Sequence, residues 1–183
     1  MKDTKRLTFS AMAVALGVLF MTLGFFVEVL DLTVSALCSI LMLFICIEVR
    51  GAYPLLVWIA TSVLGAVFFT GSLVWVTYLL IFGIFPIIKA YIERCKKPLW
   101  AVLKLVYFAL SAPAVIVISE KVLGIPFFGE DLQLPFIEGN ELIFKLAVVA
   151  ALICALMVYD VFLTVMVRAY FARLRPAMKH ILK

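Results

Sequence analysis

Residues 75–100 read WVTYLLIFGIFPIIKAYIERCKKPLW, an apolar segment that ends in a basic cluster and carries a proline and a lysine within its apolar part. Five of its residues recur every three or four positions: Tyr78, Phe82, Pro86, Lys89 and Glu93. On a helix, that spacing places all five on one face, which should lie against protein rather than lipid. Pro86 has no N–H to donate to the carbonyl of Phe82, so the pattern predicts a kink. The freed carbonyl should then be satisfied by a neighbouring helix or a polar side chain.

The composition of the chain indicates a membrane protein. Hydrophobic residues make up 67% of it and charged residues 15%, and the mean hydropathy is +1.23. A soluble domain is about half apolar and about a quarter charged. The 183 residues predict a single domain, 1–183, with room for about six spans of about 20 residues each. The net charge of +5 does not predict a nucleic-acid partner, because the basic residues lie between apolar segments.

Apolar runs separated by polar turns predict an all-α integral membrane bundle of six transmembrane helices. We expect helices at about 8–27, 32–49, 52–70, 73–94, 99–119 and 142–168. With both termini in the cytoplasm, all of the 16 Lys and Arg residues except Lys121 and Lys145 lie on the inner side. This asymmetry is the one that the positive-inside rule expects of a multi-pass protein of the cell membrane.

The sequence carries no motif of a known enzyme chemistry. Its one histidine, His180, lies in the basic tail, and no Cys/His cluster predicts a zinc site. Phosphate-binding glycine loops, GxSxG and HExxH are all missing. We therefore expect a protein that is not an enzyme and that has no metal and no cofactor. If it moves a solute uphill, the energy comes from an ion gradient or a partner.

The first predicted helix carries a strip of small residues. Ala11 and Ala15 form an AxxxA pattern, which Ala13 and Gly17 extend. Small residues four apart let another helix approach closely. The strip is either a docking surface for a partner or an internal contact between helices of this chain.

Three charged residues lie inside predicted spans. Asp160 is eight residues before Arg168, roughly 12 Å inside the basic end of its helix, and Lys89 and Lys104 lie at similar depth. A carboxylate at that depth is costly unless it is paired. We expect Asp160 to contact Lys89 or Lys104, either as a structural ion pair or as part of a proton or ion relay.

Aromatic, amide and charged residues gather near the predicted outer ends of the helices. They are Glu28, Asp31, Trp75, Tyr78, Asn140, Glu141 and Lys145. Together with the long loop at 120–141, they are candidates for a small-molecule binding site. The alternative is an aromatic belt with solvated loop charges.

The chain resembles the substrate-binding S components of energy-coupling factor (ECF) transporters, and a group of small bacterial membrane proteins of the same architecture. The opening KRLTFSAMAVA at 5–15 is similar to the start of S components. The narrower likeness is carried by FGIFPIIK at 82–89 with Glu93, by Trp100 and LKL at 103–105, and by YD at 159–160 with LT at 163–164.

The resemblance implies a ligand-binding membrane subunit with six helices. It would dock through Ala11 and Ala15 onto a transmembrane T subunit carried by two ATPases. Its small-molecule site would lie toward the outer half, roofed by loops. The competing expectation is a non-transporting scaffold of the cell envelope, because MreD-like proteins are helical bundles of this size and resemble S components.

Overall fold

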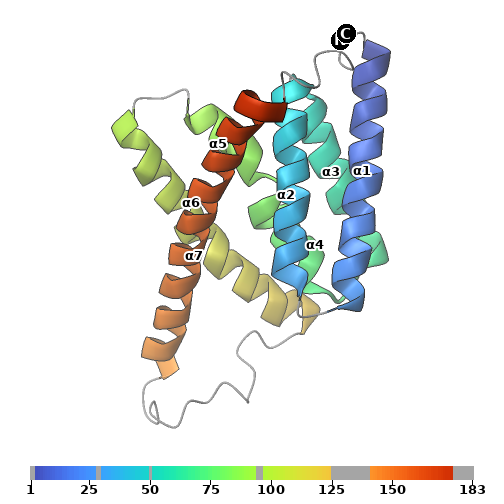
Figure 1. Ribbon diagram of the computed structural model, residues 1–183. Helices are drawn as coiled ribbons and strands as arrows, with labels where there is room; N and C mark the ends of the chain where they lie inside the picture. Colours follow the sequence, from blue (N-terminus) through green and yellow to red (C-terminus); the bar gives the residue numbers. More distant parts are fainter. Residues whose placement is uncertain (1–2, 28–29, 50, 94–96, 125–140, 175–183) are drawn as a thin grey trace.

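The computed structural model of the protein describes residues 3–27, 30–49, 51–93, 97–124 and 141–174, and every regular element among them is a helix (Figure 1). The elements are α1 (Asp3–Phe26), α2 (Asp31–Glu48), α3 (Tyr53–Phe68), α4 (Leu73–Thr77), the π-helical turn η2 (Tyr78–Phe82), α5 (Phe85–Ile92), α6 (Lys97–Ile118), the π-helical turn η3 (Ser119–Leu123), α7 (Glu141–Ala169) and the π-helical turn η5 (Tyr170–Leu174). The predicted all-α class is confirmed for these residues.

The helices form a bundle around the α4–η2–α5 segment. α1 packs against α2 and α3 on one side of it, and α6 packs against α7 on the other. The central segment contacts both groups, through α2, α3 and α6. In Figure 1 the apolar runs alternate in direction, and the start of α1 and the end of α7 lie at the same end of the bundle.

Five of the helical runs are long and apolar enough to cross a membrane. They are α1, α2, the segment Leu73–Ile92, the segment Leu99–Leu123 and the segment Ile143–Ala172. The run predicted at 52–70 is helical only over Tyr53–Phe68, bounded by Gly51 and Gly71, which both have positive φ. Its 16 residues span roughly 24 Å, less than the ~30 Å of a bilayer's hydrocarbon core. Length and composition thus assign five spans among the described residues.

The central segment is interrupted, but not at the position that Pro86 alone predicts. The N–H of Gly83 donates to the carbonyl of Tyr78, five residues earlier, at 2.6 Å, and α5 then begins at Phe85. Pro86 therefore lies in the first turn of α5, where its missing N–H breaks no helical hydrogen bond.

Side chains from neighbouring helices satisfy two carbonyls at this interruption. The indole Nε1 of Trp58 donates to the carbonyl of Leu79 at 3.2 Å, and the hydroxyl of Tyr107 donates to the carbonyl of Leu80. The sequence predicts that a neighbouring helix satisfies the freed carbonyl of Phe82. Neighbouring helices do supply donors, but to the carbonyls of Leu79 and Leu80, about one turn earlier.

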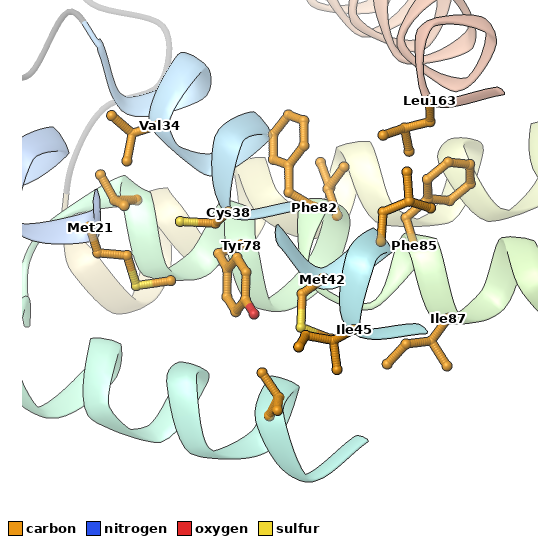
Figure 2. Close-up of a cluster of buried hydrophobic side chains, with 14 of the residues drawn as sticks. Met21, Val34, Cys38, Met42, Ile45, Tyr78, Phe82, Phe85, Ile87 and Leu163 are labelled. Carbon is orange, nitrogen blue, oxygen red and sulfur yellow. The ribbon is translucent and has the colours of Figure 1, made fainter. Parts of the chain in front are cut away.

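The core of the bundle lies around the same segment. Figure 2 shows Tyr78 between Met21 and Met42, and Phe82 and Phe85 farther along the cluster. Among the stripe residues, Tyr78, Phe82, Pro86 and Lys89 are buried, and the Glu93 side chain is 34% exposed. The prediction that this stripe faces protein is therefore confirmed. The segment Leu73–Ile92, which carries most of the stripe, is the most buried of the five apolar runs.

Candidate functional site

Asp160 on α7 lies between two lysines from different helices. The Nζ of Lys89 on α5 contacts Asp160 Oδ1, and the Nζ of Lys104 on α6 lies 2.8 Å from Asp160 Oδ2. The predicted contact is present, and it involves both candidate lysines rather than one. A single carboxylate on α7 thus joins that helix to α5 and α6, which precede it in the chain.

Lys89 is held by further oxygen atoms of α7. Its Nζ donates to the backbone carbonyl of Asp160 at 3.1 Å and to Thr164 Oγ1 at 2.7 Å. The Thr164 hydroxyl in turn donates to the Asp160 carbonyl at 2.9 Å. The spacing of four residues between Asp160 and Thr164 places both on one face of α7, so two positions on that face bind one ammonium group.

Glu93 completes the cluster, whereas the sequence predicts it only as a member of the Tyr78–Glu93 stripe. Its Oε1 lies 3.2 Å from Lys89 Nζ and 3.4 Å from Lys104 Nζ. The signal that points to it is the spacing of four residues between Lys89 and Glu93, which brings opposite charges together on a helix. We call Lys89, Glu93, Lys104 and Asp160 the charge cluster.

The charge cluster is electroneutral and almost closed to solvent. The side chains of Lys89, Lys104 and Asp160 are 3%, 7% and 12% exposed, whereas Glu93 is 34% exposed. Two cations and two anions balance, so the formal charges of these four residues compensate one another. Taking such groups out of water costs several kcal/mol per ion, and good ion-pair geometry offsets that cost. Glu93 is the member through which the cluster meets solvent.

This arrangement can do two things chemically. It fixes α5, α6 and α7 to one another, because removing any member leaves a buried charge without a full partner set. It also places two carboxylates on the same two ammonium groups, which is the composition of a relay with one exposed end at Glu93. The geometry accounts fully for the structural role, and the relay stays a hypothesis.

The small residues of α1 face two different sides of the helix. Ala13 and Gly17 are buried, and the methyl group of Thr61 on α3 lies 3.1 Å from where a Cβ on Gly17 would be. Ala11 and Ala15 are exposed. The expectation that Ala13 and Gly17 extend the AxxxA strip is wrong, because two residues along a helix turn a side chain by about 200°. Ala13 and Gly17 therefore pack inside the bundle, whereas Ala11 and Ala15 remain exposed.

Seven residues were expected near the outer ends of the helices, and those that the structure describes are not gathered in one place. Tyr78 is 1% exposed and belongs to the core, and Trp75 is half-buried one turn before it. Lys145 is exposed near the start of α7, which Figure 1 shows well apart from α4.

The remaining members lie at helix starts or outside the described residues. Asp31 begins α2 and Glu141 begins α7. Glu28 and Asn140 lie outside the described residues.

Within the described part of the chain, no group of three or more His, Cys, Asp and Glu side chains is placed to hold a metal ion. The acidic residues of the candidate site, Glu93 and Asp160, both face ammonium groups. Comparison of the chain with protein-family models, with curated proteins and with solved structures finds no match.

Proposed function

We propose that the protein crosses the cell membrane six times, with both termini in the cytoplasm. The five long apolar helices support this topology, and α3 supplies a shorter sixth pass at the edge of the bundle. Two observations are consistent with this six-pass topology. The apolar runs alternate in direction in Figure 1, and Lys and Arg are in excess on one side. In this orientation the charge cluster lies near the cytoplasmic end.

Within the membrane, we infer that the protein is the ligand-binding subunit of an ECF-type uptake transporter for a small molecule. The observation that carries this proposal is the exposed pair Ala11 and Ala15. The opposite face of α1 is already occupied, because Ala13 and Gly17 pack inward. An exposed small-residue pair allows close approach of a helix from another subunit, which would be the T subunit carried by two ATPases.

The proposal assigns different roles to different parts of the bundle. Among the described residues, α1 contacts α2, α3 and α4, and Ala11 and Ala15 are exposed for docking. The charge cluster fixes α5, α6 and α7 as one unit on the other side of the central segment. Ligand binding belongs to the outer end and the loop at 120–141, and ATP hydrolysis belongs to the partner.

The test is affinity purification of the full chain from its native membrane, followed by identification of the co-purified proteins. The proposal expects a T subunit and two ATPases with the unchanged protein. It expects the T subunit and the ATPases to be lost with Ala11→Trp or with Ala15→Trp, while the protein remains folded. Leu16→Trp is the matched control, because Leu16 is exposed on a different face of α1. Recovery of cell-wall enzymes instead would favour the scaffold and overturn the transport proposal, as would unchanged association of both tryptophan variants.

A further inference from the structure

Helix α3 is the shortest apolar run among the described residues, at 16 residues or roughly 24 Å. The segments Leu99–Leu123 and Ile143–Ala172 contain 25 and 30 residues, which corresponds to roughly 37 and 45 Å. Figure 1 shows α6 and α7 inclined to α1 and α2, so these long helices cover less thickness than their length. A long helix can fit a thin layer by tilting, whereas a short helix cannot gain length to fit a thick one.

Both ends of α3 are fixed by turns. Gly51 and Gly71, which flank the helix, have φ angles of +76° and +95°, a backbone conformation that glycine adopts readily and other residues do not. At the second turn, the N–H of Ser72 donates to the carbonyl of Phe69 at 3.0 Å, and the Ser72 hydroxyl accepts from the N–H of Val74 in α4. Lengthening α3 at either end would therefore require a turn to be rebuilt.

Close packing holds α3 in one register with α1. A Cβ added to Gly17 of α1 would lie 3.1 Å from the methyl group of Thr61, and one added to Gly65 would lie 3.0 Å from the Met21 sulfur. These two tight contacts lie one turn apart on both helices, so α3 cannot slide along α1 to reach a different depth.

The outward face of α3 has the composition of a lipid-facing surface. The small and polar residues Thr61, Ser62 and Gly65 are buried on the inward face, as expected of helix contacts within a membrane bundle. The large apolar side chains that are 40–65% exposed are Leu55, Leu56, Ile59, Val63, Val67 and Phe68.

Helix α2, which packs beside α3, gives an independent measure of thickness. It has 18 residues, roughly 27 Å, begins at Asp31 and ends at Glu48, and carries no charged residue between them. Carboxylates are costly inside the hydrocarbon core, so they mark where the core ends. The two helices thus indicate a hydrophobic thickness of about 24–27 Å, below the ~30 Å of a typical bilayer.

We propose that the outward face of α3 is a thin edge of the protein and is covered by phospholipids with short acyl chains. A bilayer adapts to a short hydrophobic stretch by thinning locally, and short acyl chains reduce the cost of that deformation. The proposal rests on the six-pass topology, because α3 must cross the bilayer to act on its thickness. It does not depend on docking through Ala11 and Ala15.

The test is reversible unfolding of the full chain in bilayers of phosphatidylcholine whose monounsaturated acyl chains have either 14 or 22 carbons. The folded-to-unfolded ratio should be about tenfold lower in the 22-carbon lipid, because the mismatch with α3 grows with the thickness of the bilayer. A ratio that does not fall from the 14-carbon to the 22-carbon lipid overturns the proposal.

Two matched variants show whether α3 causes this dependence. Val67→Asn changes the second-last residue of α3, and Val122→Asn changes the second-last residue of the 25-residue run; the two valines are 65% and 69% exposed. The loss caused by Val67→Asn should be about threefold larger in the 22-carbon lipid, because the thicker core covers the end of the short helix. Val122→Asn should cause the same loss in both lipids. If the two variants behave alike, the assignment to α3 is wrong.

Two further outcomes separate this proposal from the others. If Ile59→Cys cross-links two copies of the chain beyond the level of the unchanged protein, a protein covers this face and the proposal fails. Opposite signals from reporters at Gly51 and Lys183 would overturn the six-pass topology and the thin edge together. A six-pass topology without any dependence on acyl-chain length would overturn the thin edge alone.

Discussion

Removing the charge of Asp160 should destabilise the bundle because it leaves two buried lysines sharing one carboxylate. In Asp160→Asn, Lys89 and Lys104, whose side chains are 3% and 7% exposed, keep Glu93 as their one carboxylate partner in the cluster, at 3.2 and 3.4 Å. Lys89 also keeps its hydrogen bonds to the carbonyl of residue 160 and to Thr164. Breaking a buried pair by removing one partner costs about 3–5 kcal/mol. We expect the lower end, about 3 kcal/mol or roughly a 100-fold fall in the folded-to-unfolded ratio, because both lysines retain Glu93.

The double variant Lys89→Met/Asp160→Asn tests the ion pairing more directly than either single change. Lys89→Met alone leaves the carboxylates of Glu93 and Asp160 with one lysine, Lys104, and should also destabilise the folded bundle. Lys89→Met with Asp160→Asn leaves Lys104 and Glu93, which form a neutral pair at 3.4 Å. The double change should therefore cost about 1–3 kcal/mol less than the sum of the single changes.

The assay is reversible unfolding of the full chain in lipid bicelles, with each variant measured in the same lipid. Lys121→Met is the matched control, because Lys121 is exposed and lies outside the charge cluster, so its effect should stay within about 0.5 kcal/mol. Strict additivity of Lys89→Met and Asp160→Asn would refute the reasoning. So would an experimental structure in which Asp160 lies more than about 6 Å from both lysine nitrogens, beyond the range of a close charge partner.

Two further variants test contacts outside the charge cluster by the same unfolding measurement. Gly83→Ala should cost about 1–3 kcal/mol, because its Cβ would lie 2.7 Å from Trp58 Cδ1 and 2.8 Å from the Tyr78 carbonyl oxygen; a neutral effect would show that the interruption of the central segment is not tightly packed. Tyr170→Phe should cost about 1–2 kcal/mol by removing the 2.8 Å hydrogen bond from its hydroxyl to Glu48, which ties η5 to α2; if stability is unchanged, that contact does not hold η5 in place.

The contact between Asp160 and the two lysines was predictable, because charged groups are costly where the sequence places them, whereas the part that Glu93 takes was not predicted. A short aspartate in an apolar helix has few ways to reach water, so Asp160 needs a donor, and the depths of Lys89 and Lys104 restrict the choice. The stripe from Tyr78 to Glu93 was predictable from the spacing of its members. What the spacing did not indicate is that one carboxylate serves both lysines, since this depends on how α5, α6 and α7 cross.

Other features depend on tertiary contacts that no local pattern specifies. The interruption at Gly83 follows from the π-helical turn and from donors supplied by Trp58 and Tyr107, which come from α3 and α6. The sequence predicts a kink at Pro86, whereas in the structure Pro86 lies in the first turn of α5, after the interruption. The outer group was inferred from residue type near helix ends, but Tyr78 is taken into the core by Met21 and Met42.

The proposed membrane topology is tested most directly by a topology map made with reporter fusions to the full chain. The central claim is that six passes place both termini in the cytoplasm, with the short helix α3 as one of the passes. A reporter after Lys183 and one inserted at Gly51 should both report the cytoplasm, and one inserted at Gly129 should report the outside. Opposite signals at Gly51 and Lys183 would contradict the six-pass arrangement and with it the orientation of the charge cluster and of the proposed docking face.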